Sequence, residues 1–205
     1  MFLVKSSLTV VLLGDWNKQY IQPDWVATNI YCQEKMDLGV FGQGTDFNVN
    51  YRCNNIVIQP SQSQMIFNAL DMNHNTIERL VLYINNFLQK ATTPVLQAYG
   101  FNCEFTETKN CRFADVLDTI SDNSMIIQNG YEIISTKITR SLTKNGKILI
   151  LESSQNEDKT IMHFNEHHGN RLIEMPTIEV EMICDFLSAA KDLILALGYD
   201  IEEAE

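Results

Sequence analysis

Two segments of the chain place hydrophobic residues three and four positions apart, which is the spacing of one buried helix face. The first helix is predicted to begin at Asn75, with Asn75 as its N-cap and Glu78 completing a capping box. Pro94 should bend this helix near its last turn, because proline cannot continue the backbone hydrogen bonds. The predicted stripe consists of Ile77, Leu80, Val81, Ile84, Phe87, Leu88, Ala91, Val95 and Ala98.

The second helix is predicted to begin near Thr177 and to end at Gly198, a residue suited to the left-handed position after a helix. Gly100 and Gly198 lie 98 positions apart, and apolar residues before them match in type at that offset. The stripe of this helix consists of Val180, Ile183, Phe186, Leu187, Ala190, Ile194 and Leu197.

Strands and turns are predicted before the first helix. Residues 8–13 should form a strand and residues 23–30 a short helix, with turns at 42–44 and 53–55. Apolar and polar residues alternate from Phe47 to Arg52, as in a half-buried strand. Four strands are predicted after the short helix, over residues 37–41, 46–52, 55–59 and 64–70.

The second half of the chain predicts the same series of elements. Residues 101–107 should form a strand and residues 113–120 a short helix, and Asn145-Gly146 is a hairpin signal because both residues tolerate positive φ. Residues 153–158 are polar and predict a turn. Four strands are predicted in this half, over residues 124–128, 131–142, 147–152 and 160–165.

Each half therefore shows a strand, a short helix, four strands and a long helix. This order resembles the duplicated TATA-box-binding-protein-like fold, on which some uncharacterised bacterial families are also built. The resemblance implies an α+β fold in which two pseudo-repeats, about 1–98 and 99–205, form a single domain with a curved antiparallel sheet and the long helices on one face. Two other folds stay open: a sheet that wraps a C-terminal helix around a ligand cavity, and a pair of ferredoxin-like halves.

The charge of the chain is unevenly distributed. The net charge of the 205 residues is −11, of which residues 1–98 carry −1 and residues 99–205 carry −10. Because phosphate groups are bound mainly by Lys and Arg, nucleic acid is an unfavourable partner. Binding of nucleic acid through the sheet would require one group of basic residues to share a face, namely Arg52, Lys137, Arg140, Lys144 and Lys147.

The cysteines predict a reducing environment. The chain has five of them, irregularly spaced and without a Cys-x-x-Cys pair, so a zinc ribbon and a thioredoxin-type site are excluded. No convincing signal peptide and no apolar segment of membrane-spanning length are found. We therefore expect a cytoplasmic protein with reduced cysteines and no membrane contact.

No motif in the sequence predicts a catalytic, cofactor or metal site. Three histidines gather in residues 163–168, where His163, Glu166 and His167 could line the pocket of a ligand-binding or metal-dependent enzyme. We interpret this segment instead as the end of a strand followed by a loop. On a strand, His163 and His167 would share one face, and Glu166 and His168 the other.

The remaining hypothesis is a non-enzymatic protein-interaction module. Residues 134–142 alternate between an apolar face and a face rich in hydroxyl groups and lysine, formed by Ser135, Lys137, Thr139 and Ser141. A large solvated sheet face with no evident active site is typical of a docking surface for a protein partner or for a second copy of the chain. A homodimer is therefore one expected form.

Overall fold

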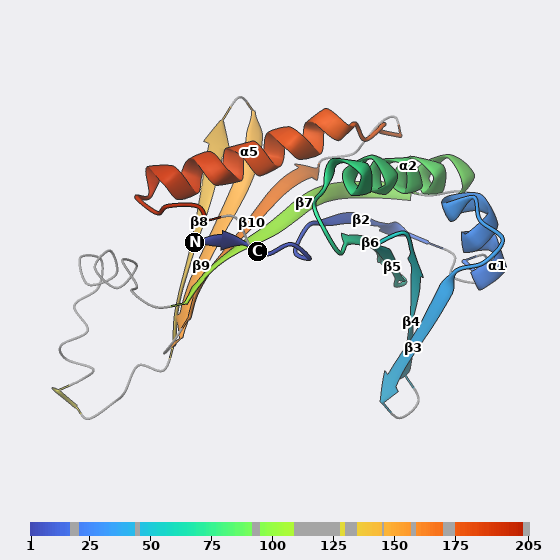
Figure 1. The fold of residues 1–205 in the computed structure, drawn as a ribbon, viewed down its shortest axis with the longest axis horizontal. Coiled ribbons are helices and arrows are strands. Elements are labelled where there is room, and N and C mark those ends of the chain that lie inside the picture. Colours follow the sequence, from blue (N-terminus) through green and yellow to red (C-terminus); the bar gives the residue numbers. More distant parts are fainter. Residues whose placement is uncertain are drawn as a thin grey trace.

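An open antiparallel sheet forms the body of the molecule (Figure 1). The computed structural model describes residues 1–16, 21–43, 46–91, 95–108, 128–129, 135–144, 146–156, 159–169 and 175–202. In these residues the sheet has ten strands, of which nine follow the order β3-β4-β5-β6-β2-β7-β10-β9-β8, while β1 pairs with β7. The strands are β1 (Phe2–Leu3), β2 (Thr9–Asp15), β3 (Asp37–Gln43), β4 (Asp46–Cys53), β5 (Ile56–Pro60), β6 (Gln64–Ala69), β7 (Val95–Thr108), β8 (Ser135–Lys144), β9 (Lys147–Asn156) and β10 (Lys159–Gly169).

Two 17-residue helices, α2 (His74–Lys90) and α5 (Val180–Ala196), lie one after the other along one face of the arched sheet (Figure 1). A shorter helix, α1 (Pro23–Val26), continues as the π-helical turn η2 (Ala27–Tyr31). The predicted α+β class and antiparallel sheet are confirmed. None of the helices in the described part of the chain is long and apolar enough to cross a membrane.

The tight turns follow the sequence signals. Asn54 and Asn55 have φ angles of 49° and 64° between β4 and β5, which gives a two-residue hairpin turn with positive φ at both positions. Gly146 and Gly198 have φ angles of 79° and 84°, so the predicted hairpin after β8 and the left-handed position after α5 are confirmed. Asn145 lies outside the described residues.

The predicted start of α2 is wrong by two residues. Asn73, not Asn75, is the N-cap, because the Asn73 side-chain oxygen accepts a hydrogen bond of 2.9 Å from the backbone N–H of Thr76. Asn75 lies inside the first turn of the helix. Residue type alone could not decide between the two positions, because asparagine is a favourable N-cap residue at either.

Replacing Asn73 with alanine is expected to lower the free energy of unfolding by about 1 kcal/mol, since the N–H of Thr76 loses its side-chain acceptor and keeps only the backbone carbonyl of residue 73, at 3.0 Å. Chemical denaturation measures the change. Asn75→Ala is the matched control, with an expected loss below about 0.5 kcal/mol. A larger loss of unfolding free energy for Asn75→Ala than for Asn73→Ala would mean that Asn75, and not Asn73, caps the helix.

The predicted end of the same helix is also wrong. Helix α2 stops at Lys90, and Val95 and Ala98 belong to β7. Residues 96–105 of β7 include apolar side chains on the buried face. Over a few residues, the spacing of these side chains fits a helix as well as a strand. Pro94 lies outside the described residues.

In the second half, the last two strands are longer than predicted. β9 continues to Asn156, so residues 153–156 are strand and not turn, and β10 continues to Gly169. Strand β8 is confirmed from Ser135 onward. The predicted helix over 113–120 and almost all of the predicted strand over 124–128 lie outside the described residues.

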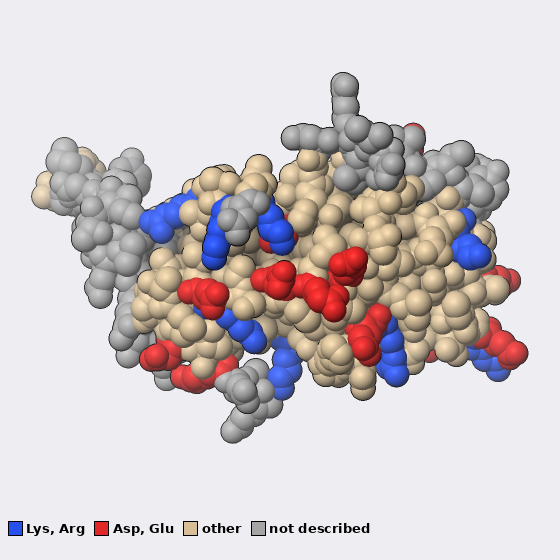
Figure 2. Space-filling model, turned by 90° about the horizontal axis from the view of Figure 1, so that it is seen from above, with Lys and Arg blue, Asp and Glu red and all other residues tan. Residues whose placement is uncertain are grey.

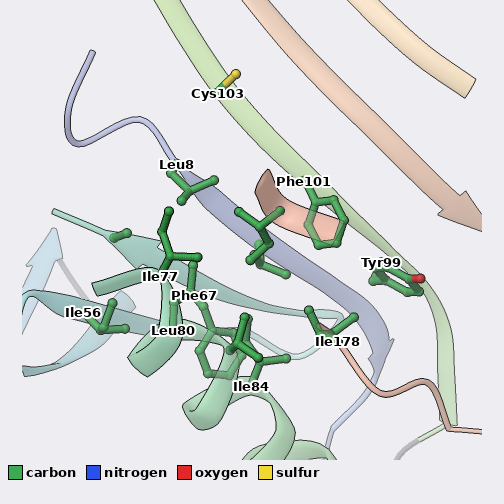
Figure 3. Close-up of a cluster of buried hydrophobic side chains, with 14 of the residues drawn as sticks. Leu8, Ile56, Phe67, Ile77, Leu80, Ile84, Tyr99, Phe101, Cys103 and Ile178 are labelled. Atoms are coloured by element: carbon green, nitrogen blue, oxygen red, sulfur yellow. The ribbon is translucent and has the colours of Figure 1, made fainter. Parts of the chain in front are cut away.

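The core fills the space between the sheet and the two helices (Figure 3). Phe87 of α2 is fully buried, with Trp16 in edge contact at a ring-centroid distance of 5.0 Å and Phe67 of β6 at 5.9 Å. Under α5, Phe101 of β7 meets Phe186 at 5.9 Å. Trp16 is only 4% exposed, and Trp25 is partly buried against the same core.

Candidate functional site

Each strand turns alternate side chains toward the helices and toward the opposite side of the sheet, which we name the open face. On β10 the helix side carries Met162 and Phe164, both buried, and the open face carries His163, Asn165 and His167. No helix of the described part of the chain covers the open face (Figure 1). Within the described residues, the open face is therefore a surface that no helix shields from a partner.

Hydroxyl groups line the open face at its β8 end. Residues Ser135, Lys137, Thr139 and Ser141 are all exposed, as the alternation predicted. The ammonium of Lys137 lies 2.8 Å from a carboxylate oxygen of Glu152 on β9, so these two charges offset each other. Strand β8 therefore gives this face a polar edge with little net charge, next to the exposed Ile148 of β9.

Amide side chains occupy the middle of the open face. The side-chain N–H of Asn165 donates to the side-chain oxygen of Asn102 on β7 at 2.7 Å. The ring of His167 lies over Gly169, where any added side-chain carbon would collide with it. The hydrogen bond fixes the orientation of the Asn165 side chain, and the missing side chain of Gly169 leaves room for the His167 ring.

A hollow of about 350 Å³ opens between β4 and the hairpin of β5 and β6. Pairing of β4 with β5 extends only from Cys53 to Tyr51, so the first part of β4 separates from the end of β5. The lining is mostly polar and uncharged, consisting of Val49, Asn50, Gln59, Pro60, Ser61, Gln64 and Ile66. Side-chain amides both donate and accept hydrogen bonds, so this site suits a ligand rich in amide or hydroxyl groups.

A buried charged group lies on the other side of the sheet, beneath α5. Glu166 is only 4% exposed, and one of its carboxylate oxygens lies 2.7 Å from Nε2 of His168 and 3.4 Å from Nζ of Lys147. The His168 ring is stacked on Tyr99 with a centroid distance of 4.5 Å, and Phe101 meets its edge at 5.3 Å. We name these four residues the Glu166 cluster: Tyr99, Lys147, Glu166 and His168.

The Glu166 cluster keeps a carboxylate ionised in a buried place. Burial by itself raises the pKa of Glu166, but the hydrogen bond from His168 and the nearby charge of Lys147 outweigh it and hold the pKa below 4.5. Burial, followed by the carboxylate of Glu166, raises the pKa of Tyr99. With its ring enclosed by Tyr99 and Phe101, His168 holds the carboxylate in place, which is a structural role.

The histidine segment does not form one site. His163 and His167 lie on the open face, whereas Glu166 lies on the helix side with His168, as the strand alternative predicted. The loop interpretation of residues 166–168 is wrong, because β10 continues to Gly169. Glu166 and His168 occupy inward-facing positions of this strand although both are polar. Among the described residues, no group of three or more His, Cys, Asp or Glu is placed to hold a metal ion.

The basic residues named for nucleic-acid binding are divided between the two faces. Lys137 and Arg52 lie on the open face, at opposite ends of the sheet. Lys147 is on the helix side with Glu166, and Arg140 pairs there with buried Leu151. Exposed acidic residues of α5, including Glu181, Asp185 and Asp192, lie on the helix side, and Figure 2 shows acidic side chains across its middle.

Sequence reasoning missed the hollow. Its lining comes from three strands and a turn, and it exists because β4 and β5 separate beyond the pair Tyr51–Ile58. The only sequence signal was the excess of amide residues at outward-facing positions such as Asn50, Gln59 and Gln64. No model of a known protein family matches the chain, and comparison with curated proteins gave no match.

Proposed function

We propose that the chain is a non-enzymatic protein-interaction module that binds an extended peptide segment of a partner in the hollow of the open face. The hollow carries the proposal, because its side-chain amides complement the N–H and C=O groups of a peptide backbone. Its volume of about 350 Å³ has room for one or two partner side chains as anchors.

The backbone of β4 supports the same mode of binding. Over Asp46–Asn50, β4 pairs with β3 on one side and has no described β5 partner on the other. An extended peptide can add to such an edge through main-chain hydrogen bonds. Ile66 and Pro60 supply apolar surface beside it.

A selection from a random peptide display library tests the proposal without a known partner. Peptides enriched on the wild-type chain are expected to bind the double variant Gln59→Ala, Gln64→Ala about tenfold or more weakly, because two hydrogen-bonding side chains are lost. Fluorescence anisotropy with a labelled peptide measures the affinity.

The matched control is Thr139→Ala on β8, which removes a polar group from the same face outside the hollow. This variant should bind the peptide as wild type does. Failure to enrich any peptide, or equal binding by the hollow variant and the wild type, would refute the proposal.

We further propose that the sheet consists of two copies of one structural unit. From the centre outward, β2, β6, β5 and β4 lie on one side, and β7, β10, β9 and β8 lie on the other. In the sequence, the strands of each side are followed by a 17-residue helix, which is α2 for the first side and α5 for the second. Because β7 begins at Val95, the boundary between the units falls before that residue and not at 98.

The cysteines support a reducing location, which we propose is the cytoplasm. Cys32, Cys53, Cys103 and Cys184 are all free, and Cys103 is buried among apolar side chains. Burial raises the pKa of the Cys103 thiol, which makes it unreactive.

A further inference from the structure

The two ends of the sheet differ in how they are protected against pairing with another strand. Strand β8 at one end carries Lys137, Arg140 and Lys144, and charged side chains of this kind keep edge strands apart. Strand β3 at the other end, Asp37–Gln43, has a single charged residue, Asp37. In the described part of the chain, no strand lies beside the outer edge of β3 (Figure 1).

Strand β3 also exposes apolar side chains. Leu38 is 50% exposed and Val40 is 58% exposed, the two highest values among the large hydrophobic strand residues whose side chains the structure describes. Both pair with helix-side residues of β4, namely Tyr51 and Val49, but β3 lies beyond the cover of α2 (Figure 1). An edge strand with free backbone groups and exposed apolar side chains is a site for strand addition.

We propose that β3 pairs antiparallel with β3 of a second copy of the chain, with Val40 opposite Val40 on a two-fold axis. This register places Leu38 opposite Gly42, which has no side chain, and Asp37 opposite Gln43. The two Asp37 carboxylates then lie about 20 Å apart, because six residues of strand separate them. The sheet continues from one protomer into the other.

The charge distribution favours a second copy as the occupant. Strand β3 belongs to the half with a net charge of −1, and the half with −10 begins near β7. Five strand spacings, about 24 Å, separate β3 from β7, which is about three screening lengths at physiological salt. Pairing through β3 therefore brings nearly neutral ends together and keeps the acidic ends apart.

The contact is small. One seven-residue strand from each copy, with Leu38 and Val40 beside it, buries less surface than the roughly 1,200–2,000 Å² of a stable interface. We expect reversible dimers with a dissociation constant on the order of micromolar.

Sedimentation velocity over roughly 1 to 300 µM tests the dimer, and should show a monomer–dimer equilibrium in the wild type. Val40→Lys is expected to weaken the dimer about tenfold or more, because two like charges would face each other across the axis. Thr139→Lys on β8 is the matched control and should leave the equilibrium unchanged. Circular dichroism and thermal unfolding check that both variants fold, and Leu38→Lys serves as the second variant if Val40→Lys does not.

Disulfide formation tests the register. In a background with Cys32, Cys111 and Cys184 replaced by serine, Val40→Cys should give a covalent dimer on mild oxidation, since residues at position 40 face each other. Leu38→Cys should not, because its counterpart lies about 14 Å away along the strands.

A monomer at every concentration, or a dimer unaffected by the β3 variants, would overturn the proposal. Covalent dimers from Leu38→Cys but not from Val40→Cys would overturn the register. The dimer uses the outer edge of β3 and not the hollow, so either result leaves the peptide-binding proposal standing. Conversely, the hollow variant should lose peptide binding and keep the monomer–dimer equilibrium of the wild type.

Discussion

Replacing Phe87 with alanine is expected to lower the free energy of unfolding by about 3–5 kcal/mol, the largest effect of any single change considered. The Phe87 ring is fully buried and contacts Trp16 and Phe67 edge-on, so its removal loses apolar burial and leaves a cavity between α2 and the sheet. Alanine is a good helix former, so the loss comes from packing and not from the helix backbone.

Urea denaturation of Phe87→Ala measures this loss, with Leu82→Ala as the matched control on the same helix. Leu82 is 52% exposed, and its replacement should change the unfolding free energy by less than about 0.5 kcal/mol. Equal losses in the two variants would mean that α2 does not pack on the sheet through the Phe87 face.

Glu166→Gln is expected to lower the unfolding free energy by about 1.5–3 kcal/mol at pH 7, the usual contribution of a hydrogen bond to a charged group. The side chain keeps its size but loses the charge that holds His168 and Lys147. Because the folded-state pKa of Glu166 lies below 4.5, the carboxylate stabilises the fold at pH values above 4.5. This stability is lost as the pH falls through the folded-state pKa.

Denaturation of the wild type and Glu166→Gln at a series of pH values between 7 and 3 separates this charge from all others, since the remaining carboxylates titrate in both proteins. The difference in unfolding free energy should shrink toward zero at the acidic end. Glu152→Gln is the control, because the ion pair of Glu152 with Lys137 is exposed and contributes at most about 1 kcal/mol. A difference independent of pH would show that the charge of Glu166 is not what stabilises the fold.

Local patterns predicted most of the described elements. The alternation in residues 135–142, the turn signals at Asn54-Asn55 and Gly146, and the apolar stripe of α5 each act over a few neighbouring residues. The structure places these elements close to where the sequence indicated.

Apart from the N-cap of α2, the errors come from residues whose partners are distant in the sequence. Val95 and Ala98 fit the stripe of α2, and only the pairing of β7 with β2 and β10 makes them strand. Glu166 and His168 looked like loop residues because the Lys147 ammonium that helps to stabilise them comes from another strand. The hollow likewise depends on where the register of β4 and β5 ends.

Side-chain amide signals in a ¹H–¹⁵N spectrum, recorded with and without a selected peptide, test the binding surface most directly. The amides of Asn50, Gln59 and Gln64 in the hollow should shift on titration. Those of Asn85 and Asn86, which donate to backbone carbonyls on the helix side, should stay unchanged. Shifts of Asn85 and Asn86 with an unperturbed hollow would place the binding surface on the helices and contradict the proposed function.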